Sequence, residues 1–381
     1  MRIKPFTLER WQSIWENQVG LNLSESGVHP LTVEELVTDK DELQRILRTP
    51  LGYPQTNGSE PLRTRVSELY PGARAQNVLM TSGCSEANFV CVWGLVEPGD
   101  DVVFMQPNYM QISGVAQSIG ASVTPLWLHE RSGWQLSLAE IKKTITNRTK
   151  LVAVCNPNNP TGAVMSRAVM DAVWARAAEV GAWVLSDEVY RGAEFEGDLT
   201  ATMFGKYDRV LCTGGLSKAY SLPGLRTGWI VGSADIVDKL WGVHDYTSIG
   251  ISMLTDKLAT IALAAEKRRW ILDRTRWILR HNYDIVRAWL GERGDFFRHV
   301  PPKAGGIAWL GYNRLWNCDV LVEELRRRKD MLLVPGSQFG MDRFLRVGFA
   351  GDPKALQNGL AKIGELLNEF ENESAVARAS R

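Results

Sequence analysis

Between residues 59 and 232, short apolar runs alternate with segments in which apolar residues recur at helical spacing. The short runs are rich in β-branched residues and predict strands, and the other segments predict amphipathic helices. In one of these segments Ser166 is placed to cap a helix whose apolar stripe includes Met170 and Val173. This alternation predicts an α/β domain with a mostly parallel sheet of seven strands, covered by helices on both faces. The predicted strands cover residues 77–83, 101–107, 122–128, 151–157, 182–190, 209–215 and 227–232.

After residue 254 the pattern predicts a smaller α+β domain. A long helical stretch carries isoleucines every seven residues from Ile271 to Ile285, and the pair Asp352-Pro353 is typical of the start of a last helix. Between these two helices, β-like segments occupy residues 305–312, 331–340 and 343–350. We therefore divide the chain into an amino-terminal segment with a substrate loop that packs on the small domain (1–45), a large domain (46–265) and a small domain (266–381).

The composition is typical of a globular protein with neither a nucleic-acid nor a membrane partner. The 381 residues are 45% hydrophobic and 23% charged, with a net charge of +1, so no strongly basic surface is expected. Charges interrupt the opening MRIKPFTLERWQSIW, which predicts neither a signal peptide nor a membrane span. We expect a cytoplasmic location. The five cysteines lack CxxC spacing and the five histidines lack HxxxH spacing, so we expect buried free thiols and no metal site.

Ligands of parallel α/β sheets bind beyond the carboxyl ends of the strands, so the residues at those ends are the candidates for chemistry. Gly83, Cys84 and Ser85 stand between a predicted strand and a predicted helix, where free N–H groups and the helix dipole favour an anion. An ordinary turn is the alternative there. The segment NPNNPTG (156–162) follows another strand, and its two prolines predict a rigid loop that holds Asn159 in one direction.

Charged residues stand at three further strand ends. Asp187, followed by Tyr190, ends an apolar strand, where a carboxylate needs a cation or hydrogen-bond donors. Lys218 can form an imine only when it is deprotonated, and Arg226 is a cation that lowers the pKa of a nearby amine and binds phosphate. Arg346 interrupts an apolar strand, and either a substrate carboxylate or a structural ion pair would satisfy it.

Taken in this order, NPNNPTG, SDEVY, LSKAYSLPGLRTGW and RVGFA resemble the motifs of the fold type I pyridoxal-phosphate (PLP) enzymes, and specifically the class I/II aminotransferases. The likeness covers about residues 20–370. It implies the fold of a type I PLP-transferase, pyridoxal 5'-phosphate as cofactor, an amino acid and a 2-oxo acid as substrates, and a homodimer.

The resemblance also assigns roles by position. Lys218 forms the Schiff base with the cofactor and moves the proton of the substrate α-carbon, and Asp187 pairs with the pyridinium nitrogen. Tyr190 and Asn159 donate to the phenolic oxygen. The other implied contacts are Gly83, Cys84, Ser85, Ser217 and Arg226 for the phosphate, Tyr53 for the phosphate of the neighbouring subunit, Tyr109 for the ring face, and Arg346 with Asn159 for the substrate α-carboxylate.

One position departs from the family pattern. Three residues before the lysine, relatives often carry a serine or threonine that contacts the phosphate, and this chain has Gly215. The loss of one hydroxyl donor is worth about 1 kcal/mol. Either the cofactor binds more weakly, or Thr213 or Ser217 compensates.

The amino-terminal segment LNLSESGVHPLTVEEL resembles the branch of the family that contains capreomycidine synthase, whose members process arginine-derived amino acids. Gly27 and His29 of this segment are therefore expected to bind substrate, and Glu25 and Asp245 suit a basic side chain. Solvated carboxylates are the alternative for these two acids. His29 is either a second acid/base group, as elimination, cyclisation or oxidation would require, or a loop residue that only packs.

Three classes of function follow. The leading prediction is an aminotransferase that passes the amino group of an L-amino acid to a 2-oxo acid, and a basic, arginine-like amino acid is the substrate hypothesis. The second is a PLP-dependent lyase, cyclase or oxidase acting on an arginine-derived amino acid. The third, a regulator with an aminotransferase-like domain, would need a DNA-binding domain, whereas only about twenty residues precede the matching region.

Overall fold

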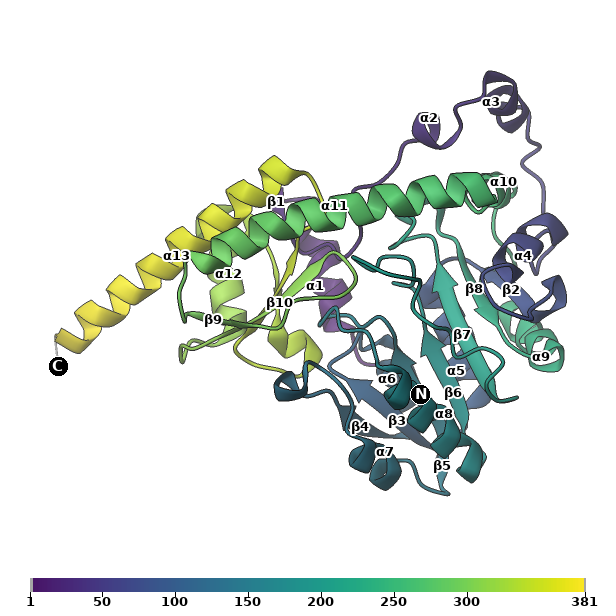
Figure 1. The fold of residues 1–381 in the computed structure, drawn as a ribbon, viewed down its shortest axis with the longest axis horizontal. Coiled ribbons are helices and arrows are strands. Elements are labelled where there is room, and N and C mark those ends of the chain that lie inside the picture. Colours follow the sequence, from purple (N-terminus) through teal and green to yellow (C-terminus); the bar gives the residue numbers. More distant parts are fainter. Residues whose placement is uncertain (1–2, 380–381) are drawn as a thin grey trace.

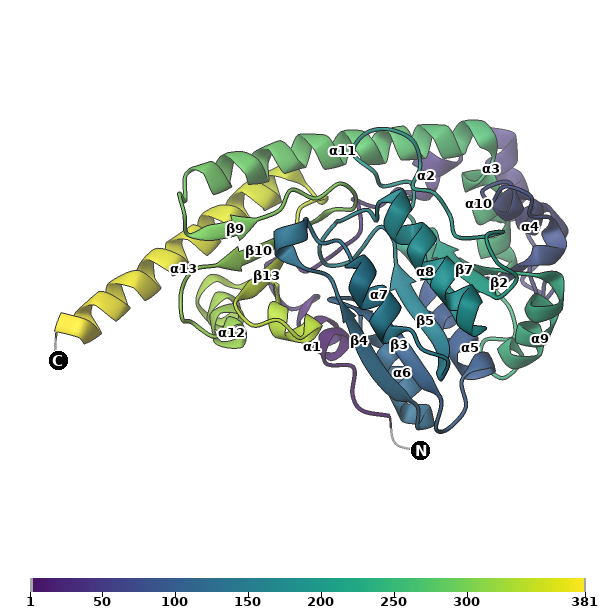
Figure 2. The same ribbon diagram turned by 60° about the horizontal axis from the view of Figure 1, so that its bottom comes forward.

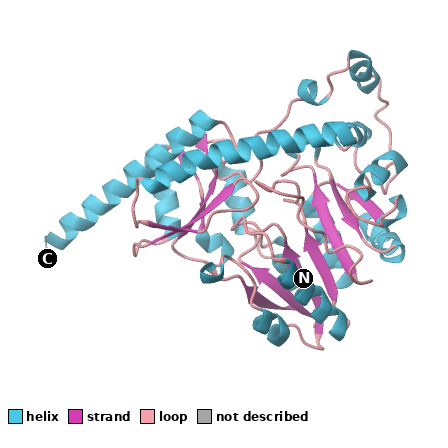
Figure 3. Cartoon of the chain, in the orientation of Figure 1, coloured by secondary structure: helices cyan, strands magenta, loops and turns pink. Residues whose placement is uncertain are grey.

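A seven-stranded sheet forms the centre of the large domain in the computed structural model (Figures 1 and 3), which describes the backbone of residues 3–379 and side chains as far as residue 373. In order across the sheet, the strands are β2 (Val78–Thr81), β8 (Gly228–Val231), β7 (Val210–Gly215), β6 (Trp183–Asp187), β5 (Thr149–Cys155), β3 (Asp101–Gln106) and β4 (Ser122–Trp127). β8 runs antiparallel to both of its neighbours, and the other pairs are parallel. The predicted fold class and mostly parallel sheet are confirmed.

The inner strands are mostly apolar because the sheet is buried on both faces, whereas the edge strand β4 exposes Ser122, Thr124 and Pro125. Along β5, Leu151 and Ala153 pack into one apolar cluster, whereas Val152 and Val154 pack into the other. Helices cover both faces, as Figure 2 shows for the side that carries α7 and α8. The helices of this domain are α4 (Glu60–Ser67), α5 (Cys84–Leu95), α6 (Gln111–Ile119), α7 (Leu138–Thr144), α8 (Arg167–Val180), α9 (Ala234–His244) and α10 (Met253–Ala262). Ser166 caps α8 as predicted, because its side chain accepts from the N–H of Val169.

The smaller lobe is built on a second sheet of antiparallel pairs, with the strand order β12 (Val334–Pro335), β13 (Phe344–Gly348), β10 (Ile307–Tyr312) and β9 (Phe297–His299). The amino-terminal segment reaches this lobe, since β1 (Leu21–Asn22) pairs in parallel with β11 (Met331–Leu332). The domain boundaries at residues 45 and 265 stay predictions. The first helices are α1 (Thr7–Trp15), α2 (Val33–Leu36) and α3 (Lys40–Leu47), and short 3₁₀ helices occupy Ala75–Asn77, Glu130–Ser132, Pro223–Leu225 and Gly336–Phe339.

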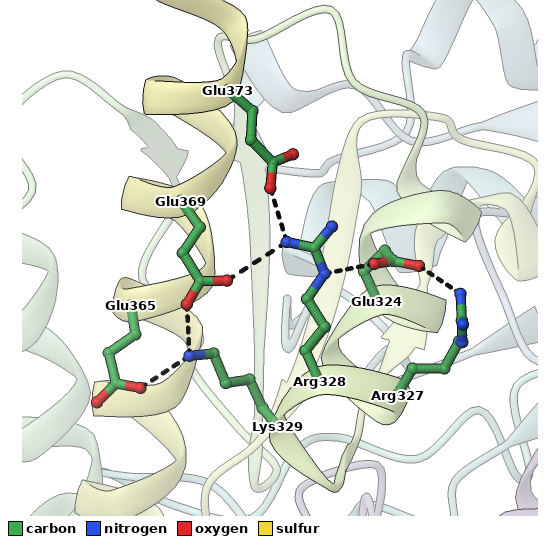
Figure 4. Close-up of polar contacts among 7 residues, drawn as sticks. All are labelled: Glu324, Arg327, Arg328, Lys329, Glu365, Glu369 and Glu373. Atoms are coloured by element: carbon green, nitrogen blue, oxygen red, sulfur yellow. Dashed lines mark hydrogen bonds and ion pairs between the residues drawn. The ribbon is translucent and has the colours of Figure 1, made fainter.

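Three helices, α11 (Ala265–Gly291), α12 (Cys318–Lys329) and α13 (Pro353–Ala379), complete the small lobe, and α11 runs from the large lobe across to it (Figure 1). Asp352 caps α13 by accepting from the N–H of Ala355. Figure 4 shows how the end of α12 is tied to α13: Arg328 pairs with Glu369 and Glu373, and Lys329 pairs with Glu365 and Glu369. Each exposed pair contributes at most about 1 kcal/mol, so the network matters as a set.

Two predictions from composition concern the whole chain. All five cysteines are free and buried, as predicted. Between residues 3 and 379, no helix combines the length and the apolar character that a membrane span needs.

Candidate active site

A cavity of about 330 Å³ lies at the carboxyl ends of the parallel strands, between the two lobes. The large lobe contributes Asp187 from the end of β6 and Lys218 from the loop after β7, the small lobe contributes Arg346 from β13, and α1 closes one side with Glu9. The volume falls within the range of small-molecule sites, about 300–1,000 Å³. The cavity therefore gathers most of the strand-end residues that the sequence singled out.

Asp187 is buried and fixed by donors. Its Oδ1 accepts from the N–H of Val189 at 3.0 Å, and its Oδ2 accepts from Asn88 Nδ2 at 2.8 Å. The Cys84 thiol lies 3.7 Å from Oδ1. Burial raises the pKa of Asp187, whereas these donors lower it. No cation lies within 4 Å of Asp187 among the described residues, so the carboxylate is available to a cationic group in the cavity.

Lys218 reaches the cavity beside the amino-terminal loop. Its Nζ donates to Ser26 Oγ at 2.9 Å, although the two residues are 192 positions apart. Burial lowers the pKa of Lys218, and the guanidinium groups of Arg346 and Arg226 lower it further, whereas Glu25 opposes them. A lowered pKa raises the fraction of neutral amine at neutral pH, as imine chemistry requires.

Arg346 is a buried cation, 1% exposed, without a carboxylate partner in the described chain. Its Nη1 donates to Asn159 Oδ1 at 3.1 Å and its Nη2 to the carbonyl of Ser24 at 2.6 Å, while its Nε has no partner. Of the two alternatives for this arginine, no structural ion pair is present in the region described. An unpaired buried guanidinium is costly, and an anionic ligand in the cavity would offset that cost.

Tyr190 and Tyr109 line the same cavity but differ in the hydrogen bonding of their hydroxyl groups. Tyr190 is buried, and its hydroxyl has no hydrogen-bond partner within the described residues. Burial raises the pKa of Tyr190, which keeps the hydroxyl a donor. Tyr109 instead donates to Glu9 Oε1 at 2.7 Å, and this bond ties α1 to the cavity wall.

The amino-terminal end of α5 and Arg226 form a site for an anion. Gly83 turns the chain from β2 into α5 with a positive φ of 89°, and a Cβ at this position would stand 2.5 Å from Arg226 Nη2. The positive φ favours glycine here, and any side chain would displace the Arg226 guanidinium. The first N–H groups of the helix, at Cys84 and Ser85, have no carbonyl acceptor within the helix, and the Ser85 and Ser217 side chains line the cavity beside them.

Gly215 stands where a side chain does not fit. A Cβ there would lie 2.8 Å from the carbonyl oxygen of Thr227, on the neighbouring strand segment. Thr213 does not replace the missing hydroxyl at the anion site, because it is fully buried and donates to Asn88 Oδ1 at 2.7 Å. Ser217 lines the cavity and is the remaining candidate.

Three glutamates line one side of the cavity, and only Glu25 was singled out from the sequence. Glu9 and Glu16 come from α1 and the turn that follows it, and neither carries a motif that predicts its position. Burial raises the pKa of Glu16, and the nearby carboxylates of Glu25 and Glu9 raise it further. Within the described chain, none of the three lies within 4 Å of a basic side chain. Ser26 and Asn88 were likewise not predicted.

Besides Gly83, Thr213 and Gly215, four residues singled out earlier lie outside the cavity wall. His29 is exposed, and its backbone N–H and carbonyl bond to Ala350 and Arg274. Gly27 lies behind the wall, where a Cβ would stand 3.4 Å from the carbonyl oxygen of Ser217. Asp245 is exposed, and Tyr53 is 91% exposed. Their expected roles stay predictions.

Comparisons with known proteins agree with this geometry. A model of the family "Aminotransferase class I and II" matches residues 18–363. Capreomycidine synthase of Streptomyces vinaceus is 32% identical over 366 residues, covering 94% of this chain and 93% of that protein. The arginine–pyruvate transaminase of Pseudomonas aeruginosa is 32% identical over 321 residues, covering 82% and 81%. Among solved structures, the PLP-dependent cyclase OrfR has a TM-score of 0.88 and 26% identity, covering 97% of this chain and 98% of that one.

Fold and site define a fold type I enzyme that depends on PLP. The chain belongs to the family of class I and II aminotransferases. The residues present fit this cofactor: a lysine with a lowered pKa, a buried carboxylate, an unpartnered tyrosine hydroxyl and an anion site surround one cavity.

Proposed function

We propose that the protein transfers the α-amino group of an L-amino acid with a basic, arginine-like side chain to a 2-oxo acid. One observation carries the choice of substrate: a single cavity holds a buried arginine, Arg346, without a carboxylate partner, and three glutamates, Glu9, Glu16 and Glu25, without a basic partner among the described residues. Arg346 suits the α-carboxylate, and the glutamates suit a cationic side chain. The arginine–pyruvate transaminase among the relatives supports the same substrate class.

In this proposal the side chains act on the substrate, on the cofactor or on both. The bound cofactor supplies an aldehyde that condenses with amino groups and a ring that withdraws electrons. Lys218 removes the proton from the substrate α-carbon and later returns a proton, and Arg346 with Asn159 holds the α-carboxylate. The cofactor contacts would be Asp187 at the ring nitrogen, Tyr190 and Asn159 at the phenolic oxygen, and Tyr109 at the ring face. At the phosphate they would be Arg226, the Ser85 and Ser217 side chains and the N–H groups of Cys84 and Ser85, with Gly83 forming the turn that presents them.

A second reaction on the same substrate class is supported by two relatives. Capreomycidine synthase and a PLP-dependent cyclase share this fold over most of the chain, so cyclisation, elimination or oxidation of an arginine-derived amino acid is the alternative. The two reactions separate by their need for an acceptor. Product analysis by mass spectrometry should show repeated turnover, beyond the single amino group that the bound cofactor can accept, only when a 2-oxo acid is present; repeated turnover in its absence would favour the alternative.

The working unit in this proposal is a homodimer. Tyr53 is 91% exposed and lies away from the cavity of its own chain, which suits a residue that contacts the cofactor phosphate of the partner subunit. Other large apolar side chains nearby in the chain, Leu47 and Leu51, are 69% and 88% exposed. Burial of such side chains would favour association.

The substrate class is tested by selectivity. We expect kcat/KM for arginine to exceed that for aspartate by about 100-fold or more. Two carboxylates of the cavity near the guanidinium of the substrate contribute several kcal/mol to binding even at a dielectric of about 20.

Replacing Glu9 and Glu16 together by glutamine keeps the shape of both side chains and removes their charge. This double substitution should lower kcat/KM for arginine about 10-fold to 100-fold without lowering that for a neutral amino acid. Glu34→Gln on α2, an exposed glutamate away from the cavity, is the control. Equal losses on both substrates, or a preference for aspartate, would contradict the proposal.

A further inference from the structure

Asn88 is a buried amide that faces the carboxylate of Asp187 from the first turns of α5. It is 2% exposed, and its Nδ2 donates to Asp187 Oδ2 at 2.8 Å although 99 positions separate the two residues. α5 is otherwise an apolar helix here, with Ala87, Val90 and Cys91 packed in the core. A buried polar group in such surroundings is costly unless its bonds are complete.

Thr213 completes the bonds of Asn88 and determines which end of the amide faces Asp187. Thr213 lies on β7, is fully buried, and donates through Oγ1 to Asn88 Oδ1 at 2.7 Å. With its oxygen held by this hydroxyl, Asn88 presents its NH₂ group to the carboxylate. The reverse orientation would place two oxygens in contact, one of them charged.

The chain from Thr213 through Asn88 to Asp187 acts on the ionisation of the carboxylate. Burial raises the pKa of Asp187, and the Asn88 bond is the largest influence that lowers it, followed by the N–H of Val189 and the Cys84 thiol. Lys218 is the cation that also lowers it. A donor to the ionised form favours that form.

We infer that Asn88 and Thr213 are positioning residues of the cofactor site, which hold Asp187 ionised and aimed so that the ring nitrogen of the cofactor stays protonated. The inference rests on the role proposed above for Asp187. Neither residue needs to touch the substrate. Both are therefore expected to affect how strongly the cofactor withdraws electrons, rather than which amino acid the enzyme accepts.

The test uses the holoenzyme loaded with ¹⁵N-labelled PLP. In Asn88→Leu, which keeps the volume and removes the donor, the ¹⁵N resonance of the ring nitrogen should move towards the value of a neutral pyridine. The variant should bind the cofactor about 10-fold to 100-fold more weakly than the wild type, since hydrogen bonds to charged groups are stronger than those between neutral groups. Thr213→Val should shift the resonance in the same direction by less, and Thr213→Ser, which restores the hydroxyl, should return it.

Controls separate this inference from a general loss of stability and from a wrong role for Asp187. Thr149 lies at the amino-terminal end of β5, on the side of the sheet away from the cavity, and its buried hydroxyl accepts from the N–H of Thr146 at 2.9 Å. Thr149→Val removes this hydroxyl and should leave the resonance unchanged. Asp187→Asn should give the full shift. If Asp187→Asn shifts the resonance but Asn88→Leu and Thr213→Val do not, the inference is wrong. If Asp187→Asn gives no shift, the proposed role of Asp187 fails with it.

Discussion

Replacing Lys218 by alanine is expected to lower the rate of substrate turnover about 10⁴-fold or more, because in the proposed function one side chain provides both the amine that anchors the cofactor and the base for the α-proton. Lys239→Ala, at an exposed lysine on α9, should leave the rate unchanged. The comparison is made with equal amounts of bound cofactor, so that weaker binding is not mistaken for slower chemistry. Residual activity within about tenfold of the wild type would contradict this role.

The lowered pKa of Lys218 also predicts how incorporation of the cofactor depends on pH. Burial disfavours the charged ammonium. The neutral amine therefore becomes available at a lower pH than in a solvent-exposed lysine, whose ordinary value is 10.5. Incorporation of the cofactor into the apoprotein should accordingly reach its full rate well below that value. An incorporation rate that still rises at the pKa of free lysine would indicate that the amine is not desolvated.

The second large effect is expected at Arg346. Arg346→Met should lower kcat/KM about 30-fold to 4,000-fold, mainly through KM, since losing one partner of a buried charged pair costs about 2–5 kcal/mol. The reason is that Arg346 is buried with its Nε unpartnered and with no carboxylate near it in the described chain. A substrate α-carboxylate would complete its bonds.

A matched ligand controls for structural damage in Arg346→Met. The decarboxylated amine that corresponds to the best amino acid lacks the group that Arg346 is proposed to bind. Its affinity, measured from the change in cofactor absorbance, should differ little between the wild type and the variant. An equal loss of affinity for amine and amino acid would show that the substitution disturbs the site as a whole, and the assignment would be wrong.

The central sheet could be predicted from the sequence because each of its strands is a short apolar run that can be recognised without knowing the tertiary structure. Each predicted run contains a strand, since strands buried on both faces are continuously apolar and are separated by helices with a clear stripe. The strand predicted over residues 182–190 was too long at its carboxyl end: β6 ends at Asp187, and Glu188 to Tyr190 lie in the turn that follows. Short strands such as β1 and β9 were not predicted, because two or three residues carry no period.

The candidate site could be predicted only where it coincides with strand ends or with a motif. Asp187 and Lys218 follow from the strand-end rule, and Arg346, which lies within β13, follows from its motif. Glu9 and Glu16 could not, because their place depends on how α1 packs over a cavity formed by residues far along the chain. Ser26 and Asn88 were missed for the same reason: their contacts with Lys218 and Asp187 span 192 and 99 positions.

Asp245 does not line the cavity of its own chain. It is exposed, whereas the carboxylates in the cavity wall, Glu9, Glu16 and Glu25, come from the amino-terminal segment. The suitability of Asp245 for a basic side chain stays a prediction. Sequence patterning identifies acidic residues, but packing determines which of them reach the cavity.

Reduction of the holoenzyme with borohydride, followed by proteolysis and mass spectrometry, determines which lysine holds the cofactor. Borohydride converts an imine between the cofactor and a lysine into a stable secondary amine, so the modified peptide identifies the lysine. We expect a single labelled peptide that contains Lys218, and no label in Lys218→Ala. A label on another lysine, or a protein that takes up no PLP, would contradict the account.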